Sequence, residues 1–145
     1  MIISIGSDHR GFRLKEELIK ELKSRNYTVI DFGTDSDASV DYPDYAESVA
    51  GSVVSGKADY GIAICGSGIG VSIAANKVKG ARAVNATNEN MAKMSRKHND
   101  ARIICFGADF IDKETALKYF DIFISTEFEG GERHERRINK LNNIK

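Results

Sequence analysis

The sequence predicts an α/β fold: a three-layer, doubly wound (Rossmann-like) five-stranded parallel sheet with a C-terminal helix. Short apolar runs alternate along the chain with longer stretches in which apolar residues recur at helical spacing, the pattern of parallel strands joined by crossover helices. The chain has 145 residues, 41% of them hydrophobic, and shows neither repeats nor an interdomain linker. This length supports one core, so we expect a single domain over residues 1–145.

Each strand is expected where a short apolar run is bounded by glycine or polar residues. After the first run, Leu14, Leu18 and Leu22 recur every four residues and predict a helix. The charged residues among them, from Lys15 to Lys23, are expected to form its solvent-exposed face. The five expected strands span residues 2–6, 28–32, 60–65, 81–85 and 103–106.

Capping residues mark the later helices. Asp44 directly follows the only proline and precedes an apolar stripe, so a helix is expected to begin near it. Asn88 and Asp112 are expected to cap two further helices. The tail from Arg133 to Lys140 surrounds an apolar position with basic side chains, which predicts a final amphipathic helix with a basic side.

The most informative stretch ends the third expected strand. An apolar run closes on Cys65 and opens into three alternating glycines within Gly66–Gly70, after which Ile69, Ile73 and Ala74 are expected on the inner face of a helix. Such a turn directs backbone N–H groups and the positive end of the helix dipole at one point, where a phosphate or a developing oxyanion is stabilised. Reactive cysteines occur beside helix N-termini, so Cys65 is a candidate for chemistry.

Composition disfavours several classes of function. Lys and Arg total 21, as do Asp and Glu, so the broad basic field that nonspecific nucleic-acid binding requires is missing. No run of eighteen apolar residues offers a membrane span, and no leader pattern precedes the first strand. We therefore expect a cytoplasmic protein with neither a nucleic acid nor a membrane as partner.

Cofactor sites are disfavoured as well. The two cysteines, Cys65 and Cys105, lack metal-ligand spacing, and Cys105 is expected to be a small buried hydrophobe. The turn Gly6–Gly11 does not have the dinucleotide fingerprint, and no lysine follows the turn at Gly66 as in a nucleotide P-loop. A nicotinamide cofactor and a nucleotide P-loop are therefore disfavoured.

The candidate residues follow the ends of different strands, where open parallel sheets bind ligands. Asp8 and His9 follow the first expected strand, Cys65 the third and Asn85 the fourth. Alone, each has a structural alternative: Asp8 caps a helix, and His98 is a helix-end residue. Together, a thiol, an amide cradle, histidines and arginines suit proton transfer beside a phosphorylated carbonyl compound. A noncatalytic sugar-phosphate sensor and a thiol redox protein are the competing readings, although no resolving cysteine follows Cys65.

Six motifs, which together span nearly the whole chain, carry a resemblance to a known family. They are Gly6–Phe12, Asp41–Pro43, Ile64–Gly70, Ala74–Lys77, Ser95–Asp100 and Phe128–Gly131. In this combination the chain resembles ribose-5-phosphate isomerase type B. The wider family also contains allose-6-phosphate and galactose-6-phosphate isomerases.

The resemblance implies an aldose-ketose isomerase that interconverts ribose 5-phosphate and ribulose 5-phosphate through an enediolate, without metal ion or cofactor. It also implies a homodimer with active sites at the subunit interface. Cys65 would be the base that moves a proton between C1 and C2, His98 the acid that opens the furanose ring, and Ser67 a donor to the enediolate. The remaining implied contacts are the N–H groups of Gly66, Gly68, Ile69 and Gly70 on the enediolate, Asp8 and Asn99 on the sugar, and His9, Arg133 and Arg137 on the phosphate.

The chain departs from the family pattern at two places. Many members have an arginine that helps bind phosphate where this chain has Asp109, an acid that cannot do so. The tail carries one residue more than the common pattern, so Arg136 competes with Arg137 for the second phosphate contact. Another branch uses a glutamate where this chain has Val71, which leaves Cys65 as the base. The choice between five- and six-carbon sugar phosphates, and assembly beyond a dimer, stay open.

Overall fold

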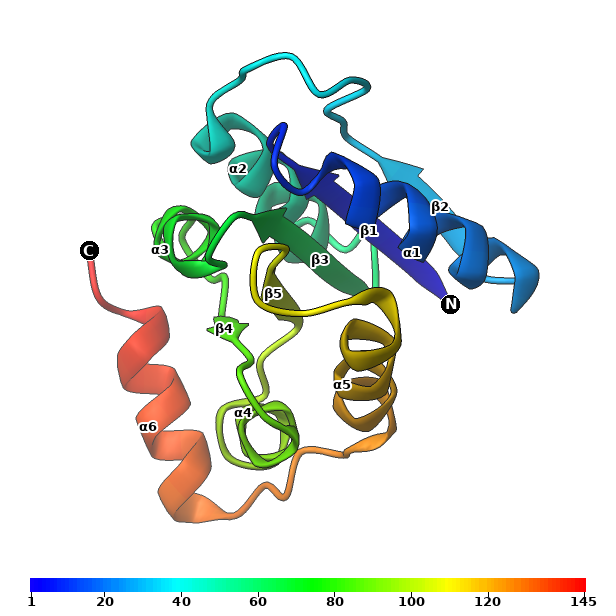
Figure 1. Cartoon of the computed structure of the whole chain (residues 1–145). Helices are drawn as coiled ribbons and strands as arrows, with labels where there is room; N and C mark the ends of the chain where they lie inside the picture. Colours follow the sequence, from blue (N-terminus) through cyan, green and yellow to red (C-terminus); the bar gives the residue numbers. More distant parts are fainter.

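The computed structural model describes all 145 residues and confirms the expected fold class (Figure 1). The strands are β1 (Ile2–Ser7), β2 (Thr28–Asp31), β3 (Tyr60–Cys65), β4 (Ala83–Asn85) and β5 (Ile103–Gly107). The helices are α1 (Phe12–Ser24), α2 (Tyr42–Val54), α3 (Ile69–Asn76), α4 (Glu89–Asn99), α5 (Lys113–Ser125) and α6 (Glu132–Asn142). All strand pairs are parallel, in the order β2-β1-β3-β5-β4.

Helices cover both faces of the sheet because its central strands are apolar on both sides. In β3, Ile62 and Ile64 point to one face, and Ala63 and Cys65 point to the other. Helices α1, α4 and α5 pack on the first face, and α2 and α3 pack on the second. The side chain of Cys65 therefore belongs to the layer that contains α2 and α3.

The expected caps form at two helices and shift at a third. The side chain of Asn88 accepts a hydrogen bond from the N–H of Met91 at 2.9 Å, and Asp112 caps α5 in the same way. Helix α2 begins at Tyr42 rather than near Asp44. Proline fits the first turn of a helix because the N–H it lacks would have no partner there, so the helix starts before Pro43 instead of after it.

Lys15 is not on the exposed face that the sequence predicted for α1. Its side chain is fully buried, and Nζ lies 2.9 Å from Asp31 and 2.8 Å from Glu16. It also lies over the ring of Phe12, 5.5 Å from the centroid. A buried ammonium group needs such partners. Asp31 lies at the end of β2, so the spacing of charged residues along α1 could not predict this ion pair.

The inner face of α3 also differs from the expectation. Val71 and Ala75 are buried, whereas Ile69 and Ile73 are 56% and 55% exposed. Both isoleucines lie on the helix that follows Cys65. The chain therefore presents an apolar surface directly beside the glycine turn.

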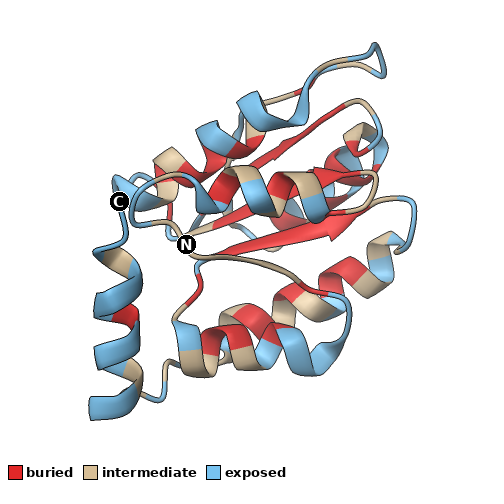
Figure 2. Cartoon of the chain, turned by 90° about the vertical axis from the view of Figure 1, so that its left-hand side faces the viewer, coloured by how far each residue is buried: buried red, intermediate tan, exposed pale blue.

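Helix α6 lies outside the three layers, next to α4, and most of its surface is exposed (Figures 1 and 2). Ile138 is its one buried residue. The basic side chains of α6 therefore lie outside the core that surrounds the sheet. None of the six helices combines the length and apolarity needed to cross a bilayer.

Candidate active site

A hollow of about 320 Å³ lies at the carboxyl edge of the sheet, where β1 and β3 end. The chain changes its direction of winding between these two strands, and ligands of doubly wound sheets bind at such a switch point. The volume is within the range of small-molecule sites. The hollow is lined by Asp8, Arg10, Tyr42, Cys65, Gly66, Ser67, Gly70 and Asp109.

Cys65 ends β3 and lines this hollow, although the residue is only 4% exposed. The N–H of Gly68 donates a hydrogen bond to its Sγ at 3.2 Å. A donor held in this way stabilises a thiolate. Cys105 lies on the neighbouring strand β5, is also free, and does not line the hollow. Burial raises the pKa of the Cys105 thiol above its usual range, so the two cysteines have different environments.

Gly68 holds the glycine turn in place against two other strands. Its φ of +79° is in the left-handed region that favours glycine. A Cβ at this position would lie 2.5 Å from Oδ1 of Asn85 and 3.0 Å from the backbone N of Gly107. Any side chain would therefore displace the turn, and with it the N–H that contacts Sγ of Cys65.

The turn after Cys65 has more backbone donors than the chain uses. The N–H of Gly68 contacts Sγ, and the N–H of Ile69 donates to Oγ of Ser67 at 3.1 Å. Four other N–H groups make no hydrogen bond within the chain, and those in the first turn of α3 also carry the positive end of the helix dipole. This cradle can receive anionic oxygens. The four free groups belong to Gly66, Ser67, Gly70 and Val71.

Asp8 and His9 occupy the turn after β1. Oδ1 of Asp8 accepts hydrogen bonds from the N–H groups of Arg10 at 3.0 Å and Gly11 at 3.1 Å, so this residue orders the turn into α1. Its other oxygen, Oδ2, stays available at the wall of the hollow. Nδ1 of His9 lies 3.2 Å from the backbone N and 3.3 Å from the carbonyl O of Val40, so Val40 holds this ring nitrogen and Nε2 makes no hydrogen bond within the chain.

The other predicted residues lie at the opposite edge of the sheet. Helix α4 crosses from the end of β4 back to the start of β5, so its last residues, His98 and Asn99, lie at the amino edge. Cys65 is instead level with Gly107 at the far end of β5. Five residues of β5 separate the two groups, about 16 Å along the strands. A single chain does not bring Cys65 and His98 together.

His98 belongs to a cluster that the motifs did not assign. Its ring stacks on that of His134 with centroids 4.7 Å apart and planes inclined by 9°. Oε2 of Glu129 lies 3.6 Å from Nε2 of His98 and 3.9 Å from Nε2 of His134. These residues are the one group close enough to suggest a metal centre. An imidazole binds a metal ion in its ring plane, and two nearly parallel planes do not meet at one ion, so the arrangement suits a carboxylate that orients two histidines.

The predicted phosphate-binding arginines lie on α6. Arg133 and Arg137 are exposed, make no ion pair, and are one turn apart on the same flank of the helix. Arg136 instead lines a shallow hollow with Glu132 and Glu135 on another face. Arg133 and Arg137 thus share one flank of the helix, and Arg136 lies on another.

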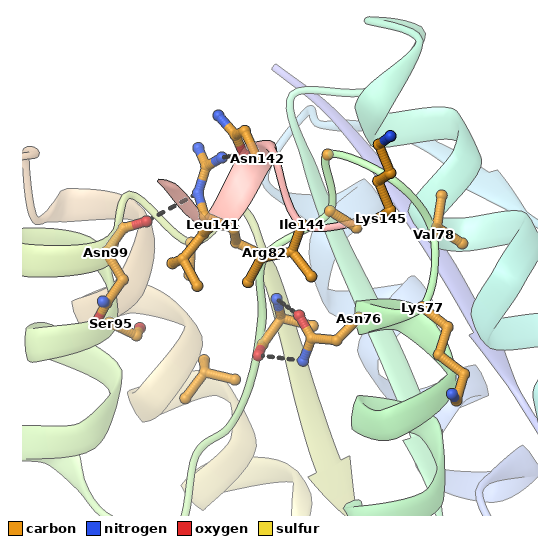
Figure 3. Close-up of a pocket in the computed structure, with 15 residues that line it drawn as sticks. Asn76, Lys77, Val78, Arg82, Ser95, Asn99, Leu141, Asn142, Ile144 and Lys145 are labelled. Carbon is orange, nitrogen blue, oxygen red and sulfur yellow. Dashed lines mark hydrogen bonds between the residues drawn. The ribbon is translucent and has the colours of Figure 1, made fainter. Parts of the chain in front are cut away.

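A larger cavity, about 770 Å³, lies beneath the end of α6 rather than beside Cys65 (Figure 3). Nε of Arg82 donates to the carbonyl of Asn99, and Nη1 donates to Oδ1 of Asn142, both at 2.9 Å. These polar groups satisfy one another, and no cysteine, histidine, aspartate or glutamate lines the cavity. It is a gap between α6 and the body of the chain with no candidate catalyst.

The comparisons with known proteins agree with this architecture. A family model described as Ribose/Galactose Isomerase matches residues 3–141. The chain belongs to the ribose/galactose isomerase family. Ribose-5-phosphate isomerase B of Escherichia coli (strain K12) is 44% identical over 142 residues, which are 98% of this chain and 95% of that protein.

Solved structures of family members match closely as well. Ribose-5-phosphate isomerase B of Clostridium thermocellum has a TM-score of 0.95 and 52% identity, covering 98% of this chain and 95% of that one. Ribose-5-phosphate isomerase B of Mycoplasma genitalium, solved with bound ribulose-5-phosphate, has a TM-score of 0.91 and 42% identity, covering 97% and 93%. The likeness to these isomerases extends over almost the full length of both chains.

Three residues of the hollow were absent from the sequence-based site. Tyr42 covers the glycine turn, because a Cβ on Gly70 would lie 2.6 Å from its ring. Tyr42 belongs to one of the family motifs, which could have drawn attention to it. Arg10 and Asp109 pair across the hollow from positions 99 residues apart, and no local pattern indicates such a contact.

Proposed function

We propose that the chain interconverts ribose 5-phosphate and ribulose 5-phosphate, with Cys65 as the base. The observation that carries the proposal is that Cys65 lines the hollow at the switch point, with its Sγ accepting the N–H of Gly68 at 3.2 Å. The name of the Escherichia coli relative and the ligand of the Mycoplasma genitalium structure support the choice of substrate.

The chemistry begins with open-chain ribose 5-phosphate. The Cys65 thiolate removes the proton from C2, the C2–H electrons form a C1–C2 double bond, and the carbonyl electrons move onto O1. The thiol then returns the proton to C1, while the O2 proton passes to O1 and O2 becomes the ketone oxygen. A single thiol thus serves both carbons, which requires that both lie within reach of Sγ.

Negative charge grows on O1 and O2 during this transfer. The N–H groups in the glycine turn and the hydroxyl of Ser67 are the donors available there. Oγ of Ser67 already accepts the N–H of Ile69, so its own hydrogen is free to donate. Loss of one donor of this kind lowers turnover by about a hundred- to a thousandfold. Asp8, which lines the same hollow, would orient the sugar hydroxyls.

Ring opening and phosphate binding require a second subunit in this proposal. We place His98 and Asn99 of the partner subunit at the hollow, with the partner's His98 as the acid that opens the furanose. The exposed Ile69 and Ile73 beside the hollow support an interface there, because two apolar side chains one turn apart on α3 form a surface that a second subunit can bury.

The phosphate contacts in this homodimer come from both chains. His9 contributes Nε2 from the turn after β1, and the unpaired Arg133 and Arg137 of the partner subunit approach with α6. Within each chain, the carboxylate of Glu129 and the stacked ring of His134 orient the ring of His98. Two free cysteines agree with a reducing compartment, so a cytoplasmic location is part of the proposal.

The test is the formation of ketose from ribose 5-phosphate, compared with that from allose 6-phosphate, for the wild type and two cysteine variants. Cys65→Ala is expected to abolish isomerisation while sugar-phosphate binding persists. Cys105→Ala is the matched control, since it removes a thiol of the same layer outside the hollow. Near-normal turnover by Cys65→Ala would refute the role of this base, and the absence of any ketose from wild-type protein would refute the proposed reaction.

A further inference from the structure

Arg10 is the only cationic side chain that lines the hollow beside Cys65. Two carboxylates, Asp8 and Asp109, line it as well. A sugar phosphate carries close to two negative charges at neutral pH, so this pair of acids would repel it. The guanidinium of Arg10 is the one positively charged side chain of this chain that offsets them inside the hollow.

The turn and the end of β5 together hold Arg10 in place. Its backbone N–H donates to Oδ1 of Asp8 at 3.0 Å, and its Nη2 donates to Oδ2 of Asp109. The pair crosses directly over the glycine turn. A Cβ on Gly66 would lie 2.8 Å from Nε of Arg10 and 3.0 Å from Oδ2 of Asp109. Because Gly66 has no side chain, the guanidinium of Arg10 can lie directly against the glycine turn.

The guanidinium keeps unused donors in this position. Its Nη2 contacts Asp109, whereas Nη1 and Nε make no hydrogen bond within the chain. The side chains of Arg10 and Asp109 are 58% and 41% exposed, and an ion pair open to solvent contributes little to stability. The planar fork can thus accept a second anion while Asp109 holds one edge.

We propose that Arg10 binds the phosphate of the substrate and that Asp109 positions its guanidinium. This inference rests on the function proposed above for the same hollow. Arg10 acts from the same chain as Cys65, and the phosphate contact it provides does not depend on the partner subunit. Asp109, which cannot itself bind phosphate, sets the direction of the fork through one nitrogen.

The first experiment measures KM and kcat for ribose 5-phosphate, together with the affinity for inorganic phosphate by calorimetry. Arg10→Ala is expected to raise KM and weaken phosphate binding by about tenfold to a hundredfold, with kcat changed by less than about threefold, because the contact is equal in ground and transition states. Arg10→Lys is expected to have a KM and a phosphate affinity between those of wild type and Arg10→Ala, because lysine keeps the positive charge but lacks the planar guanidinium.

Arg13→Ala is the matched control. Arg13 is an exposed arginine three residues away that makes no ion pair and lines no part of the hollow, so its removal changes net charge equally. Unchanged KM and phosphate affinity in Arg10→Ala, or an equal change in Arg13→Ala, would overturn the inference. If wild-type protein forms no ketose, the reaction is refuted, while the phosphate titration still tests Arg10.

A reversed pair tests the role of Asp109. Arg10→Asp is expected to raise KM more than Arg10→Ala, because a third carboxylate then faces the phosphate. Combining it with Asp109→Arg restores the net charge and returns a guanidinium to the same contact. The double variant is expected to recover at least about tenfold of the lost KM relative to Arg10→Asp alone. Equal KM values for the two would overturn the assignment of the pair to substrate binding.

Discussion

Subunit complementation is the sharpest consequence of the separation between Cys65 and His98. In one chain, Cys65 and His98 lie at opposite ends of β5, about 16 Å apart along the strand direction. At this distance the two residues cannot both contact one pentose. In a dimer that pairs Cys65 of one subunit with the partner's His98, a heterodimer of Cys65→Ala and His98→Asn has one intact site and one doubly substituted site. Random mixing makes half of the dimers heterodimers, so the expected activity is about a quarter of wild type.

The assay is ketose formation after the two variants are unfolded together, refolded and compared with each variant treated alone. Cys65→Ala mixed with Ser67→Ala is the matched control, because both substitutions lie in the same half of the site and every heterodimer keeps two defective sites. Its activity is expected to equal the mean of the separate variants. If the Cys65→Ala and His98→Asn mixture also gives only that mean, the shared site is refuted.

Three further predictions concern single positions. His98→Asn is expected to slow turnover of cyclic ribose 5-phosphate about a hundredfold but to leave deuterium exchange at C1 of ribulose 5-phosphate, an open-chain ketose, within about threefold by NMR; equal losses would exclude a ring-opening role. Iodoacetamide at neutral pH is expected to modify Cys65 and spare Cys105, whose raised pKa keeps it protonated, and mass spectrometry of the folded protein showing the reverse would contradict this. Asn88→Ala removes the cap of α4 and is expected to lower the free energy of unfolding by about 1 kcal/mol in urea with no change in kcat; an unchanged midpoint would argue against the cap.

The sheet was predictable because its strands are apolar on both faces and alternate with helical patterns. Residues 60–65 were placed without error, since the run is bounded on one side by an aspartate and on the other by the glycine turn. The start of α2 was placed too late because Asp44 and Glu47 have the spacing of a capping box, whereas the helix already includes Pro43 in its first turn.

Burial of single residues was harder to predict than the elements themselves. Periodicity placed Lys15 outside and Ile69 and Ile73 inside, and all three assignments were wrong. Lys15 is buried because Asp31 from another element meets its charge. The two isoleucines are exposed in one chain, and a pattern of apolar residues does not distinguish a core contact from a contact with another subunit.

The hollow around Cys65 was predictable from strand ends and glycine spacing, which are local features. The separation of His98 from Cys65 follows instead from the topology. Helix α4 ends at the amino edge of the sheet, whereas Cys65 lies at the carboxyl edge. The pair of Arg10 and Asp109 joins two turns that are far apart in sequence. Such contacts depend on the strand order, which the pattern of strands and helices did not specify.

The most direct test of the central claim is proton transfer at the sugar itself. Ribose 5-phosphate is incubated in D₂O with wild-type protein and with Cys65→Ala, and NMR measures deuterium at C1 of the ribulose 5-phosphate formed and at C2 of the remaining ribose 5-phosphate. The account predicts incorporation with the wild type and none above the uncatalysed rate with Cys65→Ala, which still binds the sugar phosphate. Incorporation by Cys65→Ala at a rate near that of wild type would show that another group moves the proton.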